Sequence, residues 1–240
     1  MSVYVVGDTH GSTALGCEKL NTDNWPEQKS LSSDDILIIL GDFGFIWEAE
    51  EDKTERWWLN WLLDKKATVC FLDGNHENFY RLNNFPVTQW NGGNVHIVKT
   101  RGDKNIYHLM RGEVFIINGL KLFVMGGAES TDKENRIIDV SWWKEEVPNN
   151  AEWYYADKKL AQHDNRVDYI LTHTAPSKII TNMGLVGYDK ERVNDPTAKA
   201  FDTLVETVKF KQWHFGHFHQ DVCFRDKFFC HYYNKPFMLE

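Results

Sequence analysis

The sequence predicts an α/β fold, and two observations support this prediction. Three short apolar runs in the first third of the chain, at residues 3–7, 32–41 and 65–74, have the length and composition of buried strands. Between the second and third runs, residues 48–63 carry tryptophans and leucines at helical spacing. Alternating strands and helices are typical of parallel β-α-β units, so we expect a sheet covered by helices.

The remaining elements follow in order along the chain. Residues 113–127 form two apolar runs joined by Asn118-Gly119, a dipeptide typical of a two-residue hairpin turn. Further elements are predicted at 150–163 (helix), 168–172 (strand), 196–208 (helix, with a proline just inside its start) and 213–233 (strands with a turn near Arg225-Asp226). No repeat, low-complexity tract or linker interrupts these patterns, so we expect one domain spanning residues 1–240.

The composition is that of a globular protein, with 42% hydrophobic and 26% charged residues. The net charge of −8 argues against an extended surface for nucleic acid, which needs cationic side chains to neutralise phosphates. A nucleotide in a metal-lined pocket stays possible, because bound cations supply positive charge locally. We expect a small-molecule partner rather than a long nucleic acid.

The cysteines and apolar runs indicate a cytoplasmic protein. The four cysteines form no Cys-x-x-Cys pair, so we expect reduced, buried thiols at Cys17, Cys70, Cys223 and Cys230. The N-terminus has no signal-peptide pattern, and no apolar run approaches the roughly 20 residues that span a bilayer. A membrane partner is therefore not expected.

Several predicted strands end in side chains that can bind a metal. Ligands of parallel α/β sheets bind beyond the carboxyl ends of the strands, and seven such side chains lie there: Asp8, His10, Asp42, Asn75, His173, His217 and His219. Oxygen and imidazole donors suit Mn, Fe, Zn or Ni, and the lack of sulfur ligands argues against a structural zinc site. Seven donors exceed one tetrahedral ion and predict two, with Asp42 on the middle strand as the bridge. Glycines precede several of them, which allows a sharp turn and close approach.

Five motifs in order resemble the calcineurin-like metallophosphoesterase superfamily. They are GDTHG (7–11), GDFG (41–44), GNHE (74–77), LTHTAP (171–176) and GHFH (216–219), and each follows an apolar run. The resemblance covers nearly the whole chain, from residue 7 to residue 219. It implies a four-layer α/β/β/α fold, in which a two-sheet β-sandwich is flanked by helices.

The resemblance also implies roles for the site residues. The first ion would be held by Asp8, His10, Asp42 and His219, and the second by Asp42, Asn75, His173 and His217. A water between the ions would become a hydroxide and attack phosphorus. His76 matches the family's non-ligand histidine and would protonate the leaving alkoxide. We expect a small, nucleotide-like phosphomonoester or phosphodiester as substrate, and Mn as the first choice of metal.

Two alternatives to this function are a serine/threonine protein phosphatase and a non-catalytic metal-binding scaffold, and the motifs bear on both. Serine/threonine protein phosphatases of this superfamily carry Asp-Arg-Gly after the second Gly-Asp, whereas this chain reads GDFGFIWE and has no arginine until Arg56. The two histidines of GHFH match phosphodiesterase-like branches, although GDTHG and GNHE also resemble the protein phosphatases. The second alternative, a non-catalytic metal-binding scaffold, would be marked by lost ligands. All seven ligands and His76 are present.

A substitute for the missing arginine is found in residues 126–146. Arg136 would bind a phosphate through its forked guanidinium, or it is a surface arginine paired with Asp132 or Glu134. Trp142 and Trp143 would stack a base or pack in the core or a lid.

Other features have structural interpretations. Glu77 is expected to orient a neighbour, and the stripe Trp57-Trp58-Trp61 to pack the helix on the sheet. Specificity is expected from loop-like insertions at 78–112, 128–165 and 178–196. The pattern specifies neither the natural substrate nor an oligomeric state.

Overall fold

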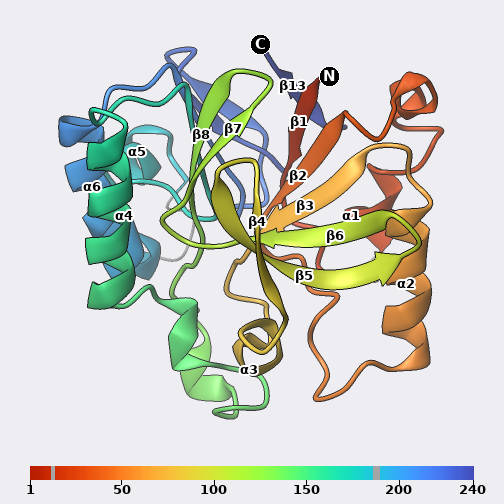
Figure 1. Cartoon of the computed structure of the whole chain (residues 1–240). Coiled ribbons are helices and arrows are strands. Elements are labelled where there is room, and N and C mark those ends of the chain that lie inside the picture. The colour runs from red at the N-terminus through yellow and green to blue at the C-terminus, as the bar shows by residue number, and fades with distance from the viewer. Residues whose placement is uncertain (12–13, 186–189) are drawn as a thin grey trace.

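The computed structural model describes residues 1–11, 14–185 and 190–240, and two sheets form its centre (Figure 1). The first sheet has seven strands in the order β13-β1-β2-β3-β6-β5-β4. Its strands are β1 (Val3–Val6), β2 (Ile36–Leu40), β3 (Thr68–Leu72), β4 (Val87–Trp90), β5 (Gly93–Arg101), β6 (Lys104–Leu109) and β13 (Phe237–Leu239). Strands β1, β2, β3 and β6 are parallel, whereas β4, β5 and β13 extend the edges by antiparallel pairing.

The second sheet has six strands in the order β11-β12-β10-β9-β8-β7. Its strands are β7 (Val114–Ile117), β8 (Leu120–Met125), β9 (Tyr169–Thr172), β10 (Gln212–Phe215), β11 (Val222–Phe224) and β12 (Phe228–Cys230). The turn of the β7–β8 hairpin has positive φ at Asn118 (52°) and Gly119 (78°), as the Asn-Gly dipeptide predicts. Strands β8, β9 and β10 are parallel, so their carboxyl ends lie at one edge.

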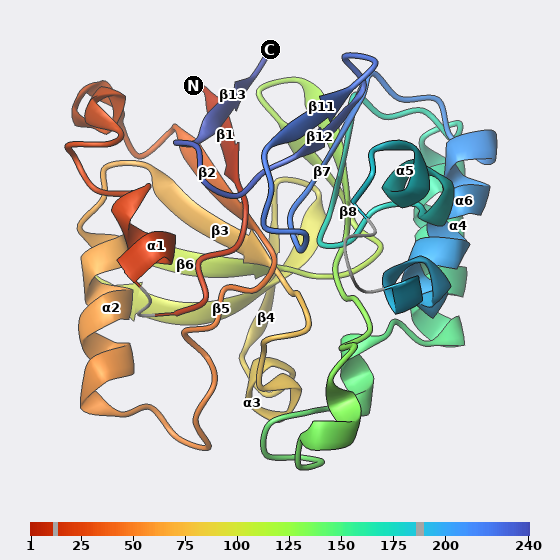
Figure 2. The same cartoon turned by 180° about the vertical axis from the view of Figure 1, so that it is seen from behind.

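Helices cover the outer faces of both sheets (Figures 1 and 2). The first sheet is covered by α1 (Ala14–Glu18) and α2 (Lys53–Leu63), and the second by α4 (Asn150–Gln162), α5 (Ser177–Asn182) and α6 (Pro196–Thr207). The short α3 (Phe79–Leu82) and four 3-10 helices, η1 (Pro26–Ser30), η2 (Lys133–Asn135), η3 (Lys144–Glu146) and η4 (Lys190–Asn194), lie in connections.

The alternation of side chains along each strand produces three apolar cores. In β2, Ile38 faces the core between the sheets, whereas Leu37 and Ile39 face the core beneath α2. A third core packs α4 and α6 onto the second sheet through residues such as Phe201. These layers confirm the four-layer α/β/β/α fold expected from the sequence.

Some local predictions were wrong. Residues 78–112 are not a loop-like insertion, because they form α3 and the strands β4, β5 and β6. Helix α2 begins at Lys53 rather than residue 48, since Asp52 caps it by accepting a hydrogen bond from the Glu55 backbone N–H (2.7 Å). Trp57 does not pack on the sheet but is 59% exposed. Cys223 is exposed, unlike the other three cysteines.

Strand β13 was not predicted, and it pairs with β1 through Val5 and Phe237. The expected insertion at 178–196 includes residues 186–189, which lie outside the described residues. Among the helices of the described residues, none has the length and apolar character required to cross a membrane.

Candidate functional site

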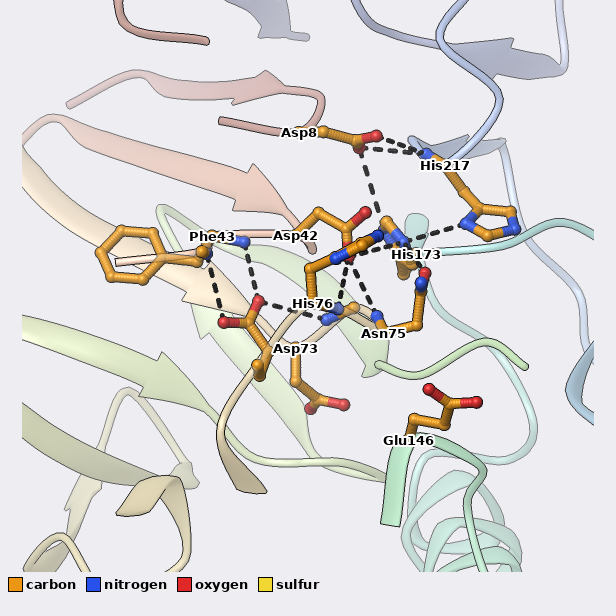
Figure 3. A network of polar contacts seen from close by, with 12 residues as sticks. Asp8, Asp42, Phe43, Asp73, Asn75, His76, Glu146, His173 and His217 are labelled. Carbon is orange, nitrogen blue, oxygen red and sulfur yellow. Dashed lines mark hydrogen bonds and ion pairs between the residues drawn. The ribbon is translucent and has the colours of Figure 1, made fainter. Parts of the chain in front are cut away.

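The carboxyl ends of five parallel strands meet at one edge of the sandwich (Figure 3). Strands β1, β2 and β3 of the first sheet and β9 and β10 of the second end there. The structure therefore brings together all seven side chains that the sequence singled out as metal ligands: Asp8, His10, Asp42, Asn75, His173, His217 and His219.

The first group of donors surrounds the ring of His10. Its Nε2 atom lies 2.9 Å from Nε2 of His219 and 3.7 Å from Oδ2 of Asp8. Oδ2 of Asp8 is also 3.4 Å from Nε2 of His219. Oδ2 of Asp42 approaches the same ring at 3.8 Å. These four side chains match the expected first site.

The second group surrounds Nε2 of His173. This atom lies 3.2 Å from Oδ1 of Asp42, 3.2 Å from Oδ1 of Asn75 and 3.2 Å from Nδ1 of His217. Asp42 is thus the member common to both groups, with one oxygen toward each. The bridging role that the sequence suggested for Asp42 stays a prediction.

The chemistry of these donors fits divalent cations. Within each of the sets Asp8–His10–His219 and Asp42–His173–His217, possible ligand atoms lie within 4.8 Å of one another, and ring nitrogens approach to 2.9 Å in the first set and 3.2 Å in the second. Every donor is a carboxylate, amide or imidazole atom, the type that Mn, Fe, Zn and Ni accept. The residues present therefore fit divalent metal ions, without selecting among these metals.

Glycines make room for the donors. A Cβ at Gly74 would lie 2.2 Å from Oδ1 of Asp42, and a Cβ at Gly216 would lie 2.1 Å from Oδ1 of Asp8. Real side chains do not approach so closely, so a larger residue at either position would displace a donor. The strand–glycine–ligand pattern of the sequence follows from this packing.

The donor loops adopt left-handed backbone conformations. Positive φ angles occur at His10 (47°), Asp42 (46°), His217 (68°) and His219 (52°). L-residues other than glycine adopt this region at a cost, and such residues concentrate at functional sites. Four of the seven donors therefore sit on backbone that the fold holds in an unfavourable conformation.

Backbone amides fix the carboxylates. Oδ1 of Asp42 accepts hydrogen bonds from the backbone N–H groups of Asn75 and His76, both at 2.9 Å. The carboxylate of Asp8 accepts from the backbone N–H of His217 at 3.0 and 3.1 Å. These bonds tie loops from distant parts of the chain to one another.

Glu77 has the orienting role that the sequence indicated. Its buried carboxylate accepts hydrogen bonds from the backbone N–H groups of Phe43 (2.7 Å) and Gly44 (3.2 Å). It therefore holds the GDFG loop rather than joining either donor group. Burial, followed by repulsion from Asp42, raises its pKa well above the usual range.

Sequence reasoning missed Ser130 and Glu146. The Asn75 side-chain amide donates to Oγ of Ser130 (3.1 Å), and Oγ of Ser130 donates to Oε2 of Glu146 (2.7 Å). Oε1 of Glu146 accepts from the Ser130 backbone (2.7 Å) and the Trp142 indole (2.8 Å). This chain turns the Asn75 carbonyl oxygen toward His173. Both residues lie in the stretch 126–146 that the sequence singled out for Arg136, but nothing in that stretch indicates a contact with Asn75.

A second pair of residues without a sequence signal supports the first group. The buried Lys19 ammonium donates to the backbone carbonyls of Asp8 (2.6 Å) and Tyr232 (2.7 Å). The Tyr232 ring stacks on His219, with centroids 4.2 Å apart. Burial lowers the pKa of Lys19 to about 8, although the Asp8 charge opposes this shift.

Charges within the second donor group shift the pKa values of its members. Burial raises the pKa of Asp42, but attraction to His173 and His76 outweighs it and holds that pKa well below the usual range. Burial lowers the pKa of His173, and Asp42 more than compensates, raising it to about 10. Burial and repulsion from His173 keep the pKa of His217 well below its usual value. Metal-free, the second group therefore contains an Asp42–His173 ion pair.

The structure places Arg136 beside His76. Nη2 of Arg136 lies 3.4 Å from Nε2 of His76 and 2.8 Å from Oδ1 of Asp132. The ion pair with Asp132 is the pairing that one expectation described, and phosphate binding by Arg136 stays a prediction. Trp143 is buried and packs edge-on against Trp47, which confirms the packing interpretation for that ring.

A cavity of about 390 Å³ adjoins the donor groups. It reaches His10 and His76 at one side and α2 at the other, and it is lined by these two histidines with Gly11, Gly44, Phe45, Trp47, Glu48, Asp52, Thr54, Glu55 and Trp58. His76 is partly buried, and its ring is 5.3 Å from that of His10. A substrate bound at the donors therefore has space to extend past His76.

Residues 1–221 match the family model described as calcineurin-like phosphoesterase. No curated protein matches the chain. A similar solved structure is the crystal structure of phosphopantetheinyl hydrolase (PptH) from Mycobacterium tuberculosis, with 19% identity, 97% of this chain and 90% of that chain covered, and a TM-score of 0.47.

The family match spans most of the chain and contains every donor described above. Members of this family hydrolyse phosphoesters with divalent metals, and the clustered aspartate and histidine side chains could bind such ions. The chain therefore belongs to the calcineurin-like phosphoesterase family and is a metal-dependent phosphoester hydrolase.

Proposed function

We propose that the chain is a binuclear-metal hydrolase of a small phosphomonoester or phosphodiester, with Asp8, His10, Asp42 and His219 at one ion and Asp42, Asn75, His173 and His217 at the other. One observation carries the proposal. The two oxygens of Asp42 face two separate groups of donors, as a carboxylate shared by two ions requires. Two ions, with manganese as the first choice, would lower the pKa of a water between them and offset phosphate charge.

The chain's own residues supply the remaining chemistry. His76 projects from the loop after β3, and its backbone N–H fixes Asp42. Its ring borders the cavity, where it would donate a proton to the leaving oxygen of the ester. Arg136, within 3.4 Å of that ring, would bind a phosphate oxygen through its guanidinium.

The alternative substrates predict different assay results. A protein phosphatase would act on phosphopeptides, and a scaffold would bind ions without hydrolysing any ester. The short GDFG loop and the two histidines of GHFH support the small-ester proposal. The cytoplasmic location stays a prediction.

The proposal is tested by metal analysis and paired esters. The protein is purified without chelator, bound metal is quantified, and bis-nitrophenyl phosphate, nitrophenyl phosphate and a phosphopeptide are assayed with added Mn. Asp42→Asn should reduce kcat/KM by about 10²-fold or more. The variant removes a charged ligand from both ions, and the ions would supply several kcal/mol of charge stabilisation to the transition state. Asp34→Asn, an exposed carboxylate at the opposite end of β2, should have no effect.

The outcomes separate the alternatives. Hydrolysis of either ester that disappears in Asp42→Asn supports the proposal, and the faster ester gives the diester or monoester preference. Two bound ions with turnover of a phosphopeptide only would indicate a protein phosphatase. Two bound ions without any turnover would overturn the enzymatic proposal in favour of the scaffold.

A further inference from the structure

The cavity beside His10 and His76 is positioned to receive the leaving group of the ester. It begins at the proposed proton donor, His76, and extends away from the donor groups toward α2. Its volume of about 390 Å³ is within the range of small-molecule sites, roughly 300–1,000 Å³. A phosphate at the donors would therefore direct its alcohol into this space.

Three aromatic rings line the cavity and are held in place by neighbours. Phe45 and Trp58 have centroids 6.0 Å apart with planes tilted by 44°. Trp58 is further fixed by Trp61, at 5.4 Å. Trp47 lies 5.9 Å from the His76 ring and is held by Trp143. Faces of such rings attract cations as well as apolar groups.

The charged side chains of the lining are all acidic. They are Glu48, Asp52 and Glu55, and no lysine or arginine lines the cavity among the described residues. Glu55 is neutralised by Arg81 through two hydrogen bonds of 2.7 Å. Asp52 caps α2, so the positive N-terminus of that helix offsets part of its charge. Glu48 is exposed and forms no ion pair within the described part of the chain.

The remaining charge of the cavity is therefore negative and depends mainly on Glu48. A second phosphate or a carboxylate on the leaving group would be repelled there, whereas an ammonium group would be attracted by both the carboxylate and the rings. The phosphate being hydrolysed would lie at the end of the cavity formed by His10, beside the donors that would hold cations.

We propose that this cavity is the leaving-group subsite and that it selects phosphoesters of cationic alcohols, such as an alcohol with an ammonium group. This inference rests on the proposed function, because it needs the phosphate to sit at the seven donors. The leaving-group subsite therefore predicts that nucleoside polyphosphates and bisphosphates are not preferred substrates.

The test uses two esters of the same shape and different charge. Choline phosphate carries a trimethylammonium group, and 3,3-dimethylbutyl phosphate has carbon in place of that nitrogen. With Mn-loaded protein, kcat/KM should favour the choline ester by roughly three- to thirtyfold, the range expected for a cation at partly desolvated rings. Added salt should reduce the ratio, because Glu48 is exposed.

Matched variants locate the effect. Glu48→Gln and Trp58→Leu should each bring the ratio of the two esters toward one. Glu50→Gln is the control, since Glu50 is an exposed carboxylate of the same loop outside the cavity lining. It should keep the wild-type ratio.

Failure of this inference differs from failure of the proposed function. If nitrophenyl phosphate is hydrolysed but the two esters react equally, or Glu48→Gln keeps the wild-type ratio, the subsite inference is overturned alone. A preference for nucleoside monophosphates over the choline ester would also overturn it, by indicating stacking of a neutral base.

A binding measurement tests the cavity without turnover. Tetramethylammonium should quench the fluorescence of the cavity tryptophans saturably, and tert-butanol should not. Loss of this quenching in Glu48→Gln would support the subsite even if no ester were hydrolysed. Equal responses to both compounds would overturn it.

Discussion

Replacement of Ser130 by alanine should weaken the second metal site without touching a metal ligand. Ser130 Oγ accepts the hydrogen bond of the Asn75 side-chain amide (3.1 Å) and donates to Glu146 (2.7 Å). Without this hydroxyl, the amide loses the partner that turns its carbonyl oxygen toward His173. The expected result is a selective loss of affinity at the site that contains Asn75.

The magnitude follows from the contacts. A buried amide N–H left without its partner costs about 1–3 kcal/mol, and outer partners of metal ligands typically contribute 10- to 100-fold in metal affinity. These two values agree, because a 10- to 100-fold change corresponds to about 1.4–2.8 kcal/mol. We therefore expect the affinity for the second Mn ion to fall by about 10- to 100-fold.

Titration calorimetry of the metal-free protein with Mn would resolve the two sites. The first site should change by less than about threefold, since Ser130 does not contact any of its donors. Ser33→Ala removes an exposed hydroxyl and serves as the control. A melting temperature close to that of the wild type would show that the fold is intact.

A double-mutant cycle decides whether Ser130 acts through Asn75. In an Asn75→Ala background the amide is absent, so Ser130→Ala should cause no further loss at the second site. Additive losses in the double variant would contradict this reasoning, and so would wild-type affinity in the single variant.

Three further predictions concern pH, packing and exposure. In metal-free protein the pKa of His173 is raised to about 10, which adds stability that is fully present below pH 6.5 and is lost as the pH rises through 10. Mn affinity should increase over the same range, because the ion displaces that proton. Melting temperatures and Mn titrations over a pH series should therefore show opposite trends, and parallel trends would contradict this prediction. Gly216→Ala should lose the first ion, because its Cβ would collide with a donor carboxylate, and normal metal content would refute this. Leu62→Ala should lower the free energy of unfolding by about 2–5 kcal/mol in denaturant titrations, because Leu62 is buried. Trp57→Ala, at an exposed site, should lower it by about 0.5 kcal/mol or less. Similar losses in the two variants would show that Trp57 packs on the fold.

The fold and the donors were predictable because their signals are local. Each buried strand reads as a short apolar run, and each donor stands directly after such a run, so the end of the strand places it. Asp42 and His173 could therefore be assigned to one edge although 130 other residues separate them in the chain. Because the neighbouring strands that end in donors are parallel within each sheet, their carboxyl ends lie on the same side and bring these side chains together.

The remaining parts of the site depend on tertiary packing. Glu146 is connected to Asn75 through Ser130, because the connection between β8 and α4 folds back against the end of β3. Trp58 has helical spacing with its neighbours, and spacing alone does not distinguish packing on the sheet from lining a cavity. Strand β4 was missed because it is an edge strand without a continuous apolar run, and the neighbouring β5 was missed because polar residues such as His96 and Lys99 interrupt its apolar residues.

The backbone of the donor loops leads to a prediction about metal removal. Four donors with positive φ cost about 1 kcal/mol or more each, a large share of a typical folding free energy of about 5–15 kcal/mol. Ion binding would offset this cost, because Mn at a thousandfold above Kd adds about 4 kcal/mol per site. For a chain of this length, one site should raise the melting temperature by roughly 8–16 °C over chelated protein. Asp42→Asn should abolish most of the increase, since it weakens both sites, and Asp34→Asn should keep it. Equal melting temperatures for chelated and Mn-loaded wild-type protein would show that these donors do not hold ions.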